Sequence, residues 1–95
     1  LCLILILSGC SKGNKTSEGE RQARLGCELL AKVGYSDEDD RIENYFSAAV
    51  GFESKFYDLS NNFSIVKGSL GQSGSQEGIG QFRIWVANDC YELTH

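Results

Sequence analysis

The sequence predicts a mainly helical fold, in which a short irregular hairpin or loop separates the helices. Two stretches in the first half carry apolar residues at the spacing of an amphipathic helix, and a third stretch near the C-terminus repeats that spacing. The chain has 95 residues, of which 41% are hydrophobic, 11% aromatic and 23% charged. This composition argues against a disordered or fibrous chain, and the length allows one domain.

The first predicted helix covers Glu18 to Val33. Good helix formers dominate this stretch, and Gly34 supplies a C-terminal stop. Its apolar residues approximate one helical face: Ala23, Leu25, Cys27, Leu30, Ala31 and Val33.

A second helix is predicted to follow Ser36, which can cap its first turn. The four consecutive acids at 37–40 then complement the positive end of the helix dipole. We favour this interpretation over calcium binding, because consecutive acids lack the alternating spacing and the Gly of a calcium loop. One stripe of this helix collects Ile42, Tyr45, Phe46, Ala49, Val50 and Glu53.

Glu53 is the only acid on that apolar stripe. Burial and the negative C-terminal end of the helix both disfavour its charged form, so we expect the pKa of Glu53 to be raised. A carboxyl group with a raised pKa suits a general acid near neutral pH. The alternatives are that the helix ends early and Glu53 turns to water, or that it pairs with Lys55 or Arg83.

The second half of the chain has a different amino-acid composition. Residues Ser60 to Glu77 are rich in Ser, Gly, Asn and Gln, which predicts a short irregular hairpin or loop and not another helix. Ile84 to Leu93 regains helical spacing. Gly78 and Gly80 alone are too weak a signal to predict nucleotide binding.

The N-terminus resembles part of a signal peptide for export. Leu1 to Leu7 is an uncharged apolar run, too short to span a bilayer, and it fits a signal peptide whose Met and basic start are missing. We therefore expect a fragment, cut short at the C-terminus as well. The predicted organisation is a signal remnant at 1–9, a flexible tether at 10–19 and a partial domain at 20–95.

The run Leu7-Ser8-Gly9-Cys10 resembles a bacterial lipobox, in which the Cys carries the lipid. The resemblance implies an exported lipoprotein of the periplasm or cell envelope, anchored to the membrane through Cys10. An ordinary secretory signal and a truncated transmembrane anchor are the alternatives.

Cys27 and Cys90 then remain for the folded part. In an oxidising compartment they can pair with each other, or each can pair with a cysteine beyond His95, and the sequence leaves both options open. No CxxC motif or His cluster is present, so we expect neither a metal nor a cofactor. The net charge of −4 argues against a nucleic-acid partner.

Two short motifs carry a family resemblance. Phe52-Glu53-Ser54-Lys55-Phe56 and Gly78-Ile79-Gly80-Gln81-Phe82 stand in order on either side of the polar stretch. Together they resemble the E-S-x-F and G-[IL]-x-Q motifs of the lysozyme superfamily, which includes goose-type and c-type lysozymes and lytic transglycosylases. The resemblance implies an α+β lysozyme-like fold. Cys27-Glu28-Leu29-Leu30 adds a likeness to the first helix of c-type lysozymes, whose Cys pairs near the C-terminus of that domain.

By this resemblance Glu53 matches the general acid, Ser54 the polar residue after it and Gln81 the Gln that lines the cleft. Tyr57 is placed to stack on a sugar. Glu77 is a candidate second carboxylate, although Gln76 stands where c-type lysozymes have their second catalytic Asp, which puts a retaining mechanism in doubt.

The resemblance implies an enzyme that cleaves the β-1,4 bond between N-acetylmuramic acid and N-acetylglucosamine in peptidoglycan, as a muramidase or a lytic transglycosylase. The alternative is a peptidoglycan-binding lipoprotein without turnover. Trp85, the only Trp in the chain, is expected to pack into the core, and stacking on a sugar face is the alternative.

Overall fold

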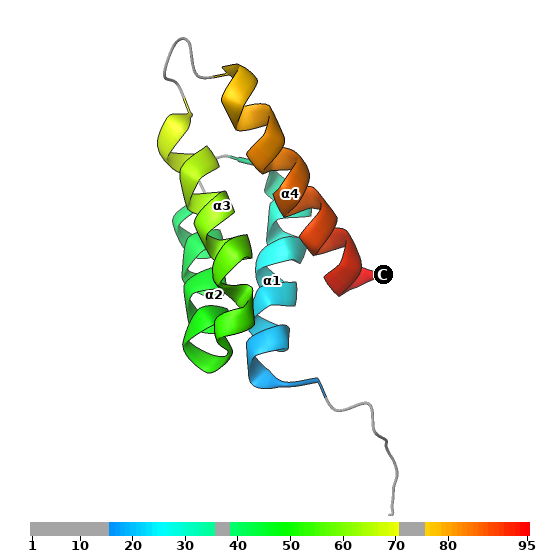
Figure 1. The fold of residues 1–95 in the computed structure, drawn as a ribbon. Coiled ribbons are helices and arrows are strands. Elements are labelled where there is room, and N and C mark those ends of the chain that lie inside the picture. The colour runs from blue at the N-terminus through cyan, green and yellow to red at the C-terminus, as the bar shows by residue number, and fades with distance from the viewer. Residues whose placement is uncertain (1–15, 36–38, 71–75) are drawn as a thin grey trace, which may run out of the picture.

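The computed structural model describes residues 16–35, 39–70 and 76–95, and over these ranges the chain forms four α-helices and no strand (Figure 1). The prediction of a mainly helical fold is confirmed. Successive helices run in opposite directions. The elements are α1 (Glu18–Val33), α2 (Asp39–Phe52), the short 3-10 helix η1 (Ser54–Phe56), α3 (Tyr57–Ser69) and α4 (Gln76–Thr94).

Helix α1 has the bounds that the sequence predicts. The Ser17 hydroxyl accepts a hydrogen bond from the backbone N–H of Glu20 at 3.1 Å, and Gly34 ends the helix with a φ of 69°. A positive φ is a conformation that Gly adopts without steric cost. The predicted tether extends too far, because Ser17 caps the helix and Gly19 is buried in the fold.

Helices α1 and α2 approach closely at Gly26, which lies against the fully buried ring of Phe46. On α2 the predicted stripe is largely confirmed, since Ile42, Phe46 and Ala49 have no exposed surface. These side chains form one cluster with residues of the other three helices. Its buried members are Ala23, Cys27, Ile42, Phe46, Ala49, Phe56, Leu59, Phe63 and Val86.

The prediction of a hairpin or loop from Ser60 is wrong, because residues up to Ser69 continue helix α3. Leu59, Phe63 and Val66 are spaced by four and three residues, so all three reach the core on one helical face. Burial of that face stabilises the helix despite the Ser and Asn residues on its other sides, whose intrinsic helix preference is weak.

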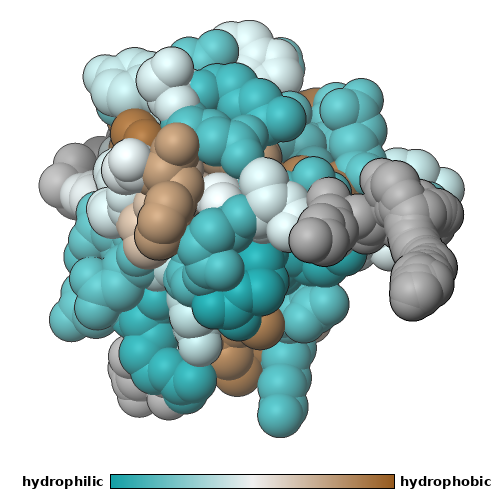
Figure 2. All heavy atoms as spheres, turned by 90° about the horizontal axis from the view of Figure 1, so that it is seen from below, coloured by the Kyte–Doolittle hydropathy of each residue, from teal (hydrophilic) through white to brown (hydrophobic). Residues whose placement is uncertain are grey.

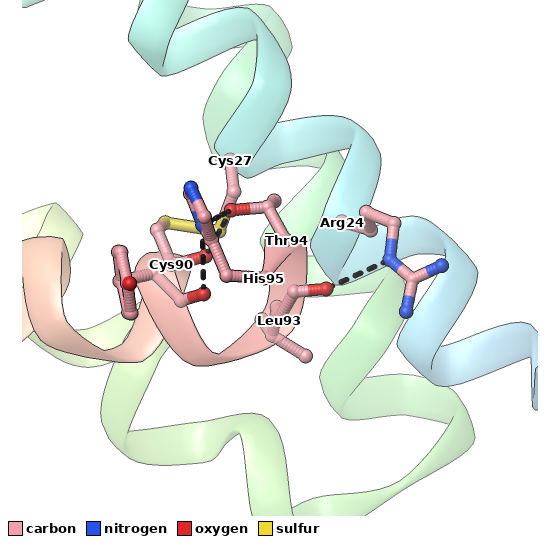
Figure 3. Close-up of a disulfide and its surroundings, with 7 residues drawn as sticks. Arg24, Cys27, Cys90, Leu93, Thr94 and His95 are labelled. Atoms are coloured by element: carbon pink, nitrogen blue, oxygen red, sulfur yellow. Dashed lines mark hydrogen bonds between the residues drawn. A yellow bond between two sulfur atoms is a disulfide. The ribbon is translucent and has the colours of Figure 1, made fainter.

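Helix α4 closes the domain and is bonded to α1. Cys27 and Cys90 form a disulfide with a Cα–Cα distance of 5.2 Å (Figure 3). Next to it, the Arg24 side chain donates a hydrogen bond from Nε to the backbone oxygen of Leu93 at 2.9 Å. These links attach the last two turns of α4 to the middle of α1.

Candidate functional site

Glu53 lies immediately after α2, because the helix ends at Phe52. Its backbone N–H still donates to the Ala49 oxygen at 2.8 Å, but its φ of −146° and ψ of 117° are those of an extended residue. The side chain therefore leaves the apolar stripe. It is 29% exposed and lies 3.4 Å from the Lys55 ammonium group, so the alternative that pairs Glu53 with Lys55 is the one found.

The expectation of a raised pKa for Glu53 is wrong. A hydrogen bond from the Ser17 side chain and the nearby Lys55 charge favour the carboxylate, and together they outweigh partial burial. The pKa of Glu53 is thus lowered from its usual value of 4.5. A carboxyl group in this state is ionised at neutral pH and holds no proton to donate.

The end of the domain where α2 turns into α3 is largely polar. Seen from below, hydrophilic residues cover most of this face and hydrophobic ones form small separate patches (Figure 2). Ser54 and Lys55 of η1 are exposed here, whereas Phe56 points inward and is buried. In the E-S-x-F sequence, the polar residues therefore face solvent, whereas the Phe belongs to the core.

The second motif does not join the first. Gly80 and Gln81 belong to the first two turns of α4 and not to a loop, and Gln81 is exposed. These turns lie at the opposite end of the bundle from the α2–α3 junction (Figure 1). Gln81 and Glu53 therefore do not share a cleft in this structure.

The remaining predicted residues are scattered. Tyr57 is the first residue of α3 and is 58% exposed, at the same end as Glu53. Glu77 falls within the first turn of α4, but its side chain lies outside the described residues, as does Cys10.

The expectation that Trp85 belongs to the core is wrong. Its side chain is 44% exposed and lines an open groove of about 510 Å³ between α3 and α4. The other lining residues are Asp58 and Asn62 of α3 and Asn88 and Asp89 of α4. This groove adjoins a second hollow of about 420 Å³ toward η1, because Asp58 and Asp89 line both.

Among the carboxyl groups that the structure describes, Asp89, and not Glu53, has a raised pKa. Partial burial is the main cause, and the negative charges of Glu92 and Asp58 add to it. Both neighbours also line the hollow toward η1, where Lys55 is the only cation among the lining residues. The groove and this hollow therefore form a continuous acidic surface.

The sequence carries a signal for this groove that the predictions missed. Trp85, Asn88, Asp89 and Glu92 are spaced by three, one and three residues, so they form one polar stripe on α4. Val86 and Cys90 lie on the inward side of the same helix. The other side of the groove is formed by Asp58 and Asn62, which lie one turn apart on α3. Because the sequence did not predict this helix, the groove could not be predicted either.

Among the described side chains, no group of three His, Cys, Asp or Glu residues is arranged to hold a metal ion. In the same part of the chain, no helix combines the length and the apolar character needed to cross a bilayer. Comparison with protein families, curated proteins and solved structures gives no significant match to this chain.

Proposed function

We propose that this domain belongs to an exported lipoprotein that binds peptidoglycan glycan strands without cleaving them. The observation that carries the absence of turnover is the state of Glu53. The residue that matches the general acid is ionised, paired with Lys55 and distant from Gln81. A glycosidase needs a proton on the acid that assists departure of the leaving group, and this environment removes it.

Three features support the envelope context. The apolar run at Leu1 to Leu7 and the lipobox-like sequence before Cys10 indicate export. The Cys27–Cys90 disulfide favours an oxidising compartment, although weakly. The two motifs that resemble the lysozyme superfamily connect this location with the glycan strand as ligand.

The test compares binding with cleavage on the same material. The purified protein is incubated with insoluble peptidoglycan sacculi, and the bound fraction and the soluble muropeptides are both measured. We expect saturable binding with no released muropeptides, and a Glu53→Gln variant that binds as the parent does. Release of muropeptides by the parent but not by Glu53→Gln would contradict the proposal.

Cleavage by Glu53 is the second candidate function. It is favoured by one observation, namely that Glu53 follows the helix directly and that its side chain is 29% exposed. Mass spectrometry of any released products distinguishes its two forms. A lytic transglycosylase leaves 1,6-anhydromuramic acid ends, whereas a muramidase leaves reducing ends.

A further inference from the structure

The groove between α3 and α4 presents an exposed aromatic ring that a second ring supports. Trp85 meets the ring of Phe82 edge to face, with a centroid distance of 5.2 Å and an angle of 89° between the ring planes. An indole that remains exposed while a second ring supports it offers a flat apolar surface to a ligand. A pyranose ring has such a flat apolar side, formed by its axial C–H groups.

Polar groups surround this ring on both helices. Asn62 and Asn88 each provide amide donors and an acceptor, and Asp58 and Asp89 provide carboxyl oxygens. Sugar hydroxyls and N-acetyl groups both donate and accept hydrogen bonds, so they match a mixed set of amides and carboxyls. A sugar ring likewise has an apolar side and a polar edge, so its surface matches that of the groove.

The groove has the size and continuity that a short oligosaccharide needs. Its volume of about 510 Å³ lies in the range of small-molecule sites, roughly 300 to 1,000 Å³. The adjoining hollow, lined by Leu59, Lys55 and Glu92, continues the path toward η1. A chain of linked sugars can therefore extend beyond the ring that stacks on Trp85.

The negative charge of the groove and the adjoining hollow indicates which sugars can bind. The two surfaces together carry Asp58, Asp89 and Glu92 against Lys55, and the fourth acid, Glu20, is paired with Arg24 at 2.8 Å. An oligosaccharide of uronic acids is repelled by this arrangement, whereas a neutral sugar is not.

We infer that the α3–α4 groove is a saccharide-binding site that takes uncharged N-acetylhexosamine units, with Trp85 as the stacking platform. The choice of N-acetylhexosamine rests on the proposed function, because this sugar alternates in the peptidoglycan strand. The groove contains neither Glu53 nor Gln81, but Phe82 of the second motif supports Trp85, and Lys55 and Phe56 of the first motif line the adjoining hollow.

The test uses a β-1,4-linked tetramer of N-acetylglucosamine as the probe. Because Trp85 is the only Trp, its fluorescence reports on the groove directly. We expect a saturable change in emission as the tetramer is added to the purified protein, and no change with a tetramer of galacturonic acid. In calorimetry, Trp85→Ala lowers the affinity for the N-acetylglucosamine tetramer by about tenfold or more, and Trp85→Phe restores part of it.

Tyr91→Ala is the matched control, since Tyr91 is an exposed aromatic residue of the same helix and lines the apolar hollow beside the disulfide instead. Its affinity should stay within about twofold of the parent's. Equal affinity in Trp85→Ala and the parent, or equal losses in Trp85→Ala and Tyr91→Ala, would overturn the assignment of the groove.

The outcome separates this inference from the proposed function. If Trp85→Ala still binds sacculi, the groove is not the saccharide-binding site, but the proposed function is retained. Tetramer binding that depends on Trp85, in a protein that does not bind sacculi, supports the groove and overturns peptidoglycan as the ligand. A protein that binds neither material contradicts both.

Discussion

At the scale of single residues, the ionisation of Glu53 depends on where one helix ends. If α2 continued for one more residue, the carboxyl group would extend the buried stripe and burial would favour its protonated form. Because the backbone at Glu53 is extended instead, its side chain meets Ser17 and Lys55. Helix ends are the least certain feature of a sequence-based prediction, so the pKa of this residue could not be predicted correctly from the stripe alone.

Titration of Glu53 by NMR should therefore give a midpoint below 4.5. A folded-state pKa below the unfolded one means that Glu53 stabilises the fold above about pH 4.5, and that this contribution is lost as the pH falls through the folded-state pKa. In Lys55→Ala the midpoint should rise toward the usual value, because the nearby positive charge is gone.

The control for this titration is Lys32→Ala, which removes an exposed cation from the opposite end of α1 and should leave the midpoint unchanged. A midpoint above 4.5 in the parent would contradict the structure and would revive Glu53 as a general acid. An unchanged midpoint in Lys55→Ala would assign the shift to Ser17 alone.

At the scale of helices, α1 and α3 show what the sequence could and could not predict. Helix α1 carries its own signals, with good helix formers throughout and Gly34 at its end, and its bounds were predicted correctly. Helix α3 lacks such signals, because Ser and Asn, whose helix preference is weak, occupy much of the helix outside its buried face. Its helical conformation depends on burying Leu59, Phe63 and Val66, so it follows from tertiary packing rather than from local preference.

The contact between α1 and α2 can be tested at Gly26. A Cβ atom there would lie 2.6 and 2.8 Å from two carbon atoms of the Phe46 ring, which is fully buried and has no room to turn away. We expect Gly26→Ala to lower the free energy of unfolding by about 1 to 3 kcal/mol, measured by urea denaturation.

Gly80→Ala is the matched control, because Gly80 also lies within a helix but a Cβ atom there meets nothing within 4 Å. This variant should be more stable than the parent by about 0.5 to 1 kcal/mol, since Gly costs entropy in a helix. If both variants lose stability equally, the close approach of α1 and α2 at Phe46 is not as the structure has it.

At the scale of the whole molecule, the candidate site depends on which helices lie side by side. The sequence placed Glu53 and Gln81 in one cleft because the motifs occur in the expected order along the chain. In the fold, the antiparallel arrangement places them at opposite ends of the bundle. Asn62 of α3 lines one groove with Trp85 and Asn88 of α4 instead. Only the pairing of α3 with α4 reveals this groove, and no local pattern specifies that pairing.

The disulfide is the covalent link that fixes α4 in this arrangement. Cys27 and Cys90 are separated by 63 positions, so the bond restricts a large part of the unfolded chain. Replacing both by Ala should lower the free energy of unfolding by about 2 to 4 kcal/mol in urea denaturation, since the unfolded state regains conformational entropy.

The parent protein in reducing agent should lose a similar amount of stability, whereas the double variant should not respond to the reductant. Hydrogen exchange should show the largest loss of protection in α4, because its last turns are then attached to α1 by the Arg24 contact and apolar packing without a covalent bond. Unchanged stability in the double variant would mean that packing alone fixes α4, and the groove would then persist under reducing conditions.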